Sequence, residues 1–482
     1  MRARTLSRLE GINMRKTKII CTIGPATSSY EMLEKLAHAG MNVVRLNMSH
    51  GDHASHAKVI KNVQRLNKNL PCHVALLLDT QGPEIRTGER DNDLNLHTGN
   101  IISVVAPGAG HVEENSLMVN YADLITDMKV GDRLTVDNGL INLEILEKHD
   151  RVMRCKVIDG GVLKSKRHVN LPGIRVNLPA ITEKDRKDIL FGMEAGVDFI
   201  ALSFVREASD IAQLNELLGD KAGKIKGIAK IENQEGVDNL EEIIDAADGI
   251  MVARGDLGVE VDFWELPNIQ RRIVRLCAQK GKRTIVATHL LESMIENPMP
   301  TRAEVTDVAN AVYEEADAIM LSGETTVGKY PIKCVEAMAR IAATIEQHRG
   351  LNFAAQLETS DHKQNLAASA VHLAESIPAK AIVVITRRGR MANFVTNCHP
   401  QLSAIHAFTN DGRTRRQLAL NRNVYAHKLI FSKDPEKTLA KAFDLLLASG
   451  DFAPGDIVVV ISDTLGSPGV EAIQVRALGN TQ

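Results

Sequence analysis

Eight short apolar runs recur along this chain, and each of them ends in polar, charged or glycine residues. They begin at Lys18, Asn42, His73, Asp198, Lys226, Gly249, Arg283 and Ala318. Runs that are apolar throughout are typical of parallel strands buried on both faces, and stretches with helical spacing separate most of them. Eight such units predict an α/β fold, a closed (β/α)8 barrel of the TIM type. In that architecture the active site lies where the strands end, so the polar residues that close the runs are expected to converge on one pocket.

Composition excludes several other classes of protein. The chain has 482 residues, and 58 basic residues balance 60 acidic ones, which gives no overall attraction to nucleic acid or to an anionic membrane. Six cysteines without CxxC spacing favour neither a zinc site nor a disulfide framework. The first residues lack the apolar stretch of a secretory signal, and no segment is long enough to span a membrane. A cytoplasmic enzyme is expected.

The regular spacing of the runs is interrupted once, between Thr80 and Gly196, by short alternating segments that suggest a small inserted β domain. The sequence TEKD at Thr182 resembles a capping box, which predicts a helix start where the chain returns to the barrel. After Arg340 a polar connection leads to a last α/β unit with strands beginning near Ala381, Ser403 and Asp456. The expected parts are an N-terminal extension (1–13), the barrel (14–82 and 183–345), an inserted lid (83–182) and a C-terminal domain (346–482).

Two neighbouring runs each end in one basic and one acidic residue. Lys230 and Glu232 are two residues apart, so on a strand both side chains point to the same face. The next run ends with Arg254 and Asp256, and Glu232 and Asp256 could together hold one Mg²⁺, which needs only one or two protein carboxylates. Lys230 would then neutralise a phosphoryl group or an enolate oxygen. The alternative is a purely structural Lys–Glu ion pair at the barrel mouth.

The second and third runs provide oxygen atoms that suit a hard cation, although coordination rules alone do not select a monovalent ion. These oxygens belong to Asn47, Ser49, Asp79 and Thr80. Arg45 and Arg86 are candidates for binding phosphate because the guanidinium group offers a rigid fork of donors, but an arginine taken alone more often forms a surface ion pair. Hydroxyl groups at Thr288 and in the LSGET segment from Leu321 could serve chemistry or cap helices.

These motifs, taken together, resemble those of the pyruvate kinase family in order and over nearly the whole chain. The matching segments include RKTKIICTIGPAT, VVRLNMSHG, LLLDTQGPEIRTG, VNLPGIRVNLPAITEKD, IAKIEN, MVARGDLGVE, NPMPTRAEVTDVANAV and LSGETTVGKYP. The resemblance implies transfer of the phosphoryl group of phosphoenolpyruvate to ADP, followed by protonation of the enolate to pyruvate. It also implies an inserted β-barrel lid, a C-terminal regulatory domain and a homotetramer.

The resemblance further implies roles for individual residues. Lys230 would stabilise the transferring phosphoryl group, Glu232 and Asp256 would bind Mg²⁺ or Mn²⁺, and Thr288 would lie near the methylene face of the enolate. The positions that match the K⁺ ligands are Asn47, Ser49, Asp79 and Thr80, and those that match phosphate contacts are Arg45 and Arg86. Substrate carboxylate would bind the backbone of Ala253, Arg254, Gly255 and Asp256 at a helix N-terminus. Nucleotide contacts are implied for Pro25, Asn47, His50, Arg86 and Arg167.

One acidic residue and three departures from the family pattern refine this interpretation. The resemblance associates a glutamate at position 84 with dependence on K⁺, whereas a lysine at this position would supply its own positive charge. His289 stands where the family commonly has glutamine, His168 where glycine is usual, and Asn138 where a second aspartate is usual. These departures bear on the protonation step and on the lid, and no metal-ligand or phosphate-contact position is lost.

The C-terminal domain contains a basic strand-to-helix segment that could bind a phosphorylated effector, either a sugar phosphate or a nucleotide. Its residues are Thr386, Arg387, Arg388, Gly389 and Arg390, and ISDTLGSPG closes another strand with a glycine-containing loop. The alternative is a solvated basic turn without a ligand. Two other functions stay open for the whole chain, namely an aldolase-type lyase of phosphoenolpyruvate or pyruvate and a catalytically silent sugar-phosphate sensor.

Overall fold

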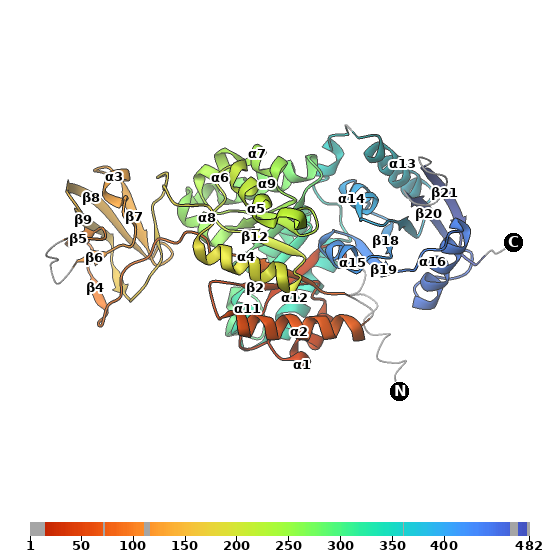
Figure 1. Cartoon of the computed structure of the whole chain (residues 1–482), viewed down its shortest axis with the longest axis horizontal. Coiled ribbons are helices and arrows are strands. Elements are labelled where there is room, and N and C mark those ends of the chain that lie inside the picture. Colours follow the sequence, from red (N-terminus) through yellow and green to blue (C-terminus); the bar gives the residue numbers. More distant parts are fainter. Residues whose placement is uncertain (1–14, 71–72, 110–115, 360, 463–470, 480–482) are drawn as a thin grey trace.

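The computed structural model of the chain describes residues 15–70, 73–109, 116–359, 361–462 and 471–479. Its three parts lie in a row, with the inserted domain at one end, the barrel in the middle and the C-terminal domain at the other end (Figure 1). The predicted N-terminal extension (1–13) and the segment 463–470, which contains most of the predicted closing loop, lie outside the described residues. No helix in the described ranges is long and apolar enough to cross a membrane.

The central part is the closed parallel barrel that the eight runs predicted. Its strand order is β1-β16-β15-β14-β13-β12-β3-β2, and every pairing is parallel. The strands are β1 (Lys18–Thr22), β2 (Val43–Asn47), β3 (Ala75–Asp79), β12 (Phe199–Leu202), β13 (Lys226–Ile231), β14 (Gly249–Ala253), β15 (Arg283–Ala287) and β16 (Ala318–Leu321). The surrounding helices and 3-10 turns are α1 (Tyr30–Ala39), α2 (His53–Asn69), α4 (Glu183–Ala195), α5 (Ala208–Leu218), η1 (Gly219–Lys221), α6 (Gln234–Asp238), α7 (Leu240–Ala246), α8 (Arg254–Glu260), η2 (Phe263–Glu265), α9 (Leu266–Gln279), η3 (Glu292–Ile295), α10 (Arg302–Tyr313), α11 (Gly323–Thr326) and α12 (Pro331–Ile345).

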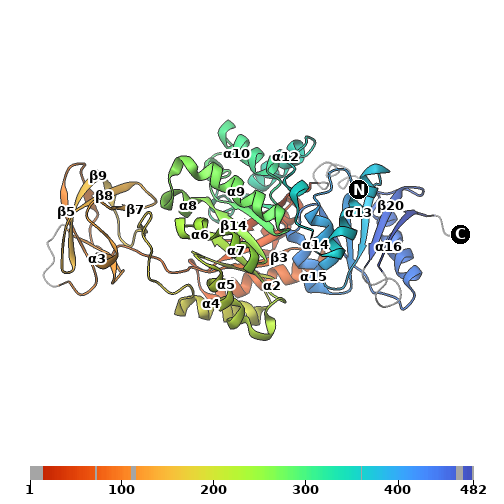
Figure 2. The same cartoon turned by 90° about the horizontal axis from the view of Figure 1, so that it is seen from above.

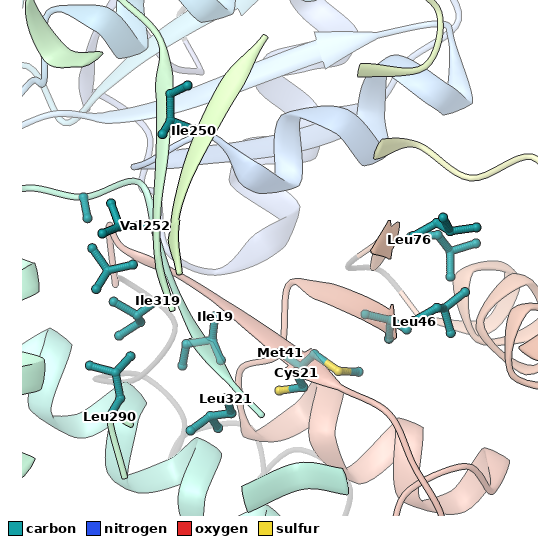
Figure 3. Packing of buried hydrophobic residues seen from close by; sticks show 14 of the residues in the cluster. Ile19, Cys21, Met41, Leu46, Leu76, Ile250, Val252, Leu290, Ile319 and Leu321 are labelled. Atoms are coloured by element: carbon teal, nitrogen blue, oxygen red, sulfur yellow. The ribbon is translucent and has the colours of Figure 1, made fainter. Parts of the chain in front are cut away.

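The strands are apolar on both faces because each face packs against a different core. Side chains such as Ile20, Met251 and Met320 fill the inside of the barrel. The alternate side chains, including Ile19 and Ile319, point outward and pack against the helices, as Figure 3 shows for part of this cluster. The period-2 geometry of a strand divides one apolar run between the two cores, which explains why the runs lack an alternating pattern.

The inserted domain is a mainly β unit between β3 and α4, and its first residues join the two edges of its main sheet. Arg86 bridges to His168 next to Val169, and Thr87 bridges to Val119 next to Met118, which agrees with the small β-barrel that the resemblance implies. Its described strands form a six-stranded sheet, β11-β7-β8-β9-β5-β6, and a separate pair, β10-β4. The elements are β4 (Leu94–Leu96), β5 (Ile101–Val105), β6 (Leu117–Met118), α3 (Leu124–Asp127), β7 (Arg133–Val136), β8 (Ile141–His149), β9 (Val152–Asp159), β10 (Gly161–Leu163) and β11 (Val169–Asn170). The chain returns to the barrel at α4, where Thr182 and Asp185 form the predicted capping box.

The C-terminal domain has a five-stranded sheet of order β19-β18-β17-β20-β21, in which β21 alone is antiparallel to its neighbour. The sequence predicted β17, β18 and β20, and the structure adds the two edge strands. The elements are η4 (Phe353–Gln356), α13 (His362–Ser376), β17 (Ala381–Ile385), α14 (Arg390–Asn397), β18 (Ala404–Thr409), α15 (Gly412–Gln417), η5 (Leu418–Leu420), β19 (Val424–Lys428), α16 (Pro435–Ser449), β20 (Ile457–Ser462) and β21 (Ala472–Ala477).

The C-terminal domain closes one end of the barrel and leaves the other end to the inserted domain (Figure 2). Leu420 of η5 belongs to the cluster that fills the barrel interior. Lys18, at the start of β1, donates to the carbonyl of Val424 at 2.7 Å, and Arg416 pairs with Asp198, which precedes β12, at 2.9 Å. These contacts lie where the strands begin. The carboxyl ends of the strands, where a barrel enzyme carries its chemistry, therefore face the inserted domain.

A buried histidine pair in the C-terminal sheet predicts that the protein loses stability in mild acid. His406 and His427 lie 3.0 Å apart through Nδ1 and Nε2, and burial lowers the pKa of His406 to about 3 and that of His427 to about 4. Because both values lie below that of an unfolded histidine, about 6.5, the unfolded chain binds more protons as the pH falls through 6.5. We expect the melting temperature to fall between pH 6.5 and 4.5, and to fall less steeply in a His406→Phe/His427→Phe double variant.

Calorimetry or dye-based melting from pH 7.5 to 4.5 measures both slopes. The matched control is His149→Phe, because the side chain of His149 is 71% exposed. Its slope should equal that of the wild type. Equal slopes in the wild type and the double variant would show that the buried pair does not determine the acid sensitivity.

Candidate active site

Lys230 lies at the centre of a buried polar cluster at the carboxyl end of β13. Its ammonium group is 2.9 Å from Oε1 of Glu232, 3.1 Å from Oδ1 of Asp79 and 2.6 Å from Oγ of Ser203. Burial alone would lower the pKa of Lys230, but Asp79 and Glu232 outweigh it and hold the pKa above the ordinary value. The structure therefore brings together Lys230, Glu232 and Asp79 as predicted, and the lysine is a permanent cation.

Glu232 and Asp256 form a carboxylate pair next to this lysine. Burial raises the pKa of Glu232, Lys230 opposes the shift, and the negative charges of Asp256 and Asp79 add to it. Glu232 accepts from the backbone N–H of Phe204 at 2.7 Å, whereas the described part of the chain gives the Asp256 carboxylate no hydrogen-bond or ion-pair partner. A divalent cation bound between Glu232 and Asp256 would offset the negative charge that helps to raise the pKa of Glu232. Among the described residues, no cluster of three or more His, Cys, Asp or Glu side chains has the arrangement of a metal site.

Asp256 reaches this position from a helix and not from the end of a strand. β14 ends at Ala253, and the chain turns directly into α8, so Arg254 to Asp256 occupy the first helical turn. Residues two apart on a helix lie on opposite sides of it, and the Arg254 side chain pairs with Asp307 at 2.7 Å. The same guanidinium group donates to the carbonyl of Thr288 at 2.5 Å. In this structure the Arg254 side chain anchors the loop after β15.

Thr288 follows β15 in a strained conformation that fixes its hydroxyl. The φ angles of Thr288 and His289 are 69° and 55°, a left-handed region that non-glycine residues rarely adopt. The Thr288 hydroxyl donates to the carbonyl of Ala287 at 2.6 Å and accepts from the N–H of Gly255 at 2.8 Å. These bonds attach the loop after β15 to the first turn of α8. His289 is exposed and lies 3.3 Å from Glu292.

The predicted monovalent-cation residues lie at the ends of β2 and β3. Asn47 and Asp79 face each other in the register of these strands, and Asn47 Oδ1 accepts from the N–H of Ser49 at 3.1 Å. Asp79 is fully buried between Lys230 and Arg45, whose Nε is 2.5 Å from Asp79 Oδ2. Burial would raise the pKa of Asp79, but the two cations lower it overall.

Thr80 is oriented differently from its neighbours in this set. Its hydroxyl accepts from the N–H of Ser203 at 3.0 Å, and its carbonyl accepts from the hydroxyl of the same serine at 2.7 Å. Thr80 is thus directed towards β12.

The predicted nucleotide residues are spread over the barrel rim and the inserted domain. Arg86 Nε donates to Glu84 at 2.7 Å, and Arg167 is 3.4 Å from Asp137. The remaining members of the set, Pro25 and His50, are exposed. His168 bridges to the backbone of Arg86. Asp137 and Asn138 both have a φ of 57°, in a turn that asparagine tolerates well.

Sequence reasoning assigned no chemistry to Ser203 and Phe204, the residues that follow β12. Ser203 is 1% exposed and contacts Lys230, Asp79 and Thr80. The available signal was the run DFIALSF. Its polar closing residue, Ser203, could have been considered as a site residue, as the closing residues of the other seven runs were.

The basic segment of the C-terminal domain has the predicted strand-to-helix geometry. It connects β17 to α14, and Gly389, with a φ of 76°, caps the helix. Arg387, Arg388 and Arg390 are exposed, and Arg390 pairs with Asp361 at 2.6 Å. The segment thus presents a cationic surface on the C-terminal domain, and one of its three arginines already has an acidic partner.

Comparisons with known proteins agree with this arrangement. The pyruvate kinase barrel domain matches residues 14–335, and the pyruvate kinase alpha/beta domain matches residues 364–472. The chain is 45% identical to the pyruvate kinase of Geobacillus stearothermophilus over 463 residues, which cover 94% of this chain and 78% of the relative. It is 44% identical over 451 residues to the chloroplastic pyruvate kinase isozyme G of Nicotiana tabacum, with 93% and 80% covered. The chain therefore belongs to the pyruvate kinase family.

Proposed function

We propose that this chain catalyses the pyruvate kinase reaction in the pocket at the carboxyl ends of the barrel strands. The phosphoryl group of phosphoenolpyruvate passes from the enol oxygen to a β-phosphate oxygen of ADP, and the remaining enolate is protonated at its methylene carbon. The products are ATP and pyruvate. The observation that carries this proposal is Lys230, a buried permanent cation next to the Glu232–Asp256 carboxylate pair.

Lys230 provides positive charge where negative charge spreads over the transferring group. Phosphoryl transfer depends mainly on positioning and on electrostatic stabilisation, because the transition state distributes charge over three equatorial oxygens. Its rigid contacts with Asp79 and Ser203 hold the ammonium group in place without reorganisation. Arg45, which is held by Asp79 and by Thr22 at 2.9 Å, is the second cation for the phosphoryl group.

Glu232 and Asp256 would hold the divalent cation, Mg²⁺ or Mn²⁺. When bound, this ion supplies positive charge to the carboxylate and enol oxygens of the substrate. The backbone of residues Ala253 to Asp256, at the start of α8, would orient the substrate carboxylate. Thr288, whose hydroxyl already contacts Gly255, would face the methylene carbon that is protonated.

The enzyme is proposed to require K⁺ in addition to the divalent cation. Oxygen atoms of Asn47, Ser49, Asp79 and Thr80 would bind it, and these residues lie at adjacent strand ends. Glu84 accepts from Gln81 and Arg86 at 2.7 Å each, and despite partial burial, which raises its pKa, these partners lower the pKa overall. The negative charge of Glu84 favours binding of a monovalent cation nearby. A lysine at position 84 would supply that positive charge itself and remove the need for K⁺.

The experiment that tests the function follows pyruvate formation from phosphoenolpyruvate and ADP with Mg²⁺, in KCl and in a tetramethylammonium salt. We expect the rate of the wild type to fall at least about tenfold when tetramethylammonium replaces K⁺. The rate of Glu84→Lys should hardly change. The control Glu89→Lys makes the same charge change at an exposed side chain, and should keep the K⁺ requirement. Full wild-type activity without K⁺ would refute the cation site, and no activity in any salt would refute the function.

The remaining features of the proposal concern regulation and assembly. We propose that ADP binds between the barrel rim and the inserted domain through Pro25, Asn47, His50, Arg86 and Arg167. The basic segment from Thr386 to Arg390 is proposed to bind a phosphorylated effector, and the chain to form a cytoplasmic homotetramer. The domain boundaries proposed are those at residues 82/83, 182/183 and 345/346.

A further inference from the structure

The chain makes an unusual corner directly after β12, beside the candidate active site. β12 ends at Leu202, Ser203 follows, and Phe204 has a φ of 54°. A bulky residue in this left-handed conformation is an outlier that persists only where the surroundings enforce it. The corner bonds to both Lys230 and Glu232, the two residues on which the proposed function most depends.

Ser203 fixes the direction of the Lys230 ammonium group. Its hydroxyl has a single proton, which it donates to the carbonyl of Thr80 at 2.7 Å, so towards Lys230, at 2.6 Å, it acts as an acceptor. The three N–H groups of Lys230 therefore have three acceptors, on Ser203, Asp79 and Glu232. If Glu232 turned towards a metal ion, Ser203 and Asp79 would still hold the ammonium group in place.

Phe204 fixes Glu232 through its backbone. Its N–H donates to Glu232 Oε2 at 2.7 Å, and the left-handed conformation belongs to the turn that presents this N–H to the carboxylate. The ring packs against Gly82, where an added Cβ would come within 2.8 Å of the ring and of Ser203 Cβ. It also lies 6.2 Å from the ring of His168 in the inserted domain, and both rings line a cavity of about 260 Å³ between that domain and the barrel.

We propose that Ser203 and Phe204 are positioning residues of the phosphoryl-transfer site. Ser203 orients the Lys230 ammonium group, and the backbone of Phe204 orients the Glu232 carboxylate. Neither residue is required to touch the substrate. This inference rests on the proposed function, because it assigns the two residues an effect on kcat and on divalent-cation affinity through Lys230 and Glu232.

The first test replaces Ser203 with alanine. We expect kcat to fall by about tenfold or more, because a hydrogen bond to a charged group is lost, while KM for phosphoenolpyruvate changes by less than about threefold. The control Ser403→Ala removes a similar buried bond, from a serine hydroxyl to the carbonyl of Ala379 at 2.7 Å, in the C-terminal domain. It should lower the melting temperature but leave kcat unchanged.

A double-variant comparison separates positioning from general destabilisation. In a Lys230→Met background Ser203→Ala should cause no further loss of the residual rate, because its effect passes through Lys230. An additional loss as large as that in the wild type would overturn the role of Ser203. A wild-type kcat in the Ser203→Ala single variant would also overturn the role of Ser203. Inactivity of the wild type, or full activity of Lys230→Met, would instead overturn the proposed function itself.

The second test compares glycine and valine at position 204. Both remove the ring, but glycine adopts a φ of 54° freely, whereas the β-branched valine strongly disfavours it. The probe is Mn²⁺ alone, titrated into the enzyme without substrates and detected by electron paramagnetic resonance. We expect Phe204→Gly to bind Mn²⁺ with nearly wild-type affinity, and Phe204→Val to bind at least about fivefold more weakly. Equal affinities in the two variants would show that the backbone of Phe204 does not orient Glu232.

Discussion

Replacing Lys230 with methionine is expected to lower kcat for pyruvate formation by roughly 10³-fold, the effect of removing a key positive group from a phosphoryl-transfer site. Methionine keeps most of the length and apolar volume of the lysine stem, so the fold should survive. The lost group is a buried cation whose pKa is held above the ordinary value by Asp79 and Glu232 against the opposing effect of burial. A coupled assay that consumes the pyruvate measures kcat and KM for phosphoenolpyruvate separately. We expect the loss to appear mainly in kcat, because the charge acts most strongly in the transition state.

The same strand provides a matched control for this prediction. Lys226 begins β13 at its opposite end and pairs with Asp248 at 2.8 Å, with about a third of its side chain exposed. Lys226→Met therefore makes the same chemical change on the same strand, far from the carboxyl end, and should keep kcat within about twofold. If Lys230→Met kept kcat within tenfold of the wild type, the lysine would be a structural ion-pair partner, the alternative that the sequence left open.

Much of the barrel could be predicted because buried parallel strands leave a strong signal. In a run such as KIICT the central residues Ile19, Ile20 and Cys21 are all apolar, since Ile19 and Cys21 pack against helices and Ile20 fills the barrel. The capping box at Thr182 was similarly local, so its position could be read directly. The edge strands β19 and β21 of the C-terminal domain were missed because they are half-exposed and contain polar residues, as in VYAHK from Val424. Such strands depend on pairing with their neighbours more than on their own pattern.

In the candidate active site, too, local features could be predicted and features that depend on the surrounding structure could not. Lys230 and Glu232 could be assigned to one face because they are two residues apart around the end of a strand. Arg254 and Asp256 have the same spacing, but there the chain has already become a helix, so their side chains diverge and Arg254 pairs with Asp307. Spacing is informative only where the secondary structure is known to continue. The contacts of Ser203 were hidden for another reason, since they join the ends of three strands, one of which, β3, is 123 residues away in sequence.

A second large effect is expected at the carboxylate pair. Glu232→Gln and Asp256→Asn each remove one charged oxygen ligand while keeping the size of the side chain. We expect each variant to need at least about 100-fold more Mg²⁺ for half-maximal activity, because a hard cation depends strongly on ligand charge. The two variants should differ in one respect. Burial is the main cause that raises the pKa of Glu232, and the negative charge that Asp256→Asn removes adds to it. In that variant the remaining carboxylate should ionise at lower pH.

Binding of Mn²⁺ without substrates, measured between pH 6 and 8, distinguishes these effects from a loss of catalysis alone. In the wild type, affinity should increase with pH, because the proton on Glu232 competes with the metal for the same oxygens. This pH dependence should become shallower in Asp256→Asn, although the binding itself is weaker. Asp262→Asn is the control, since it removes an exposed carboxylate just beyond α8 and keeps a residue that can cap η2. If both pocket variants bound Mn²⁺ as tightly as this control, the two carboxylates would not form the metal site.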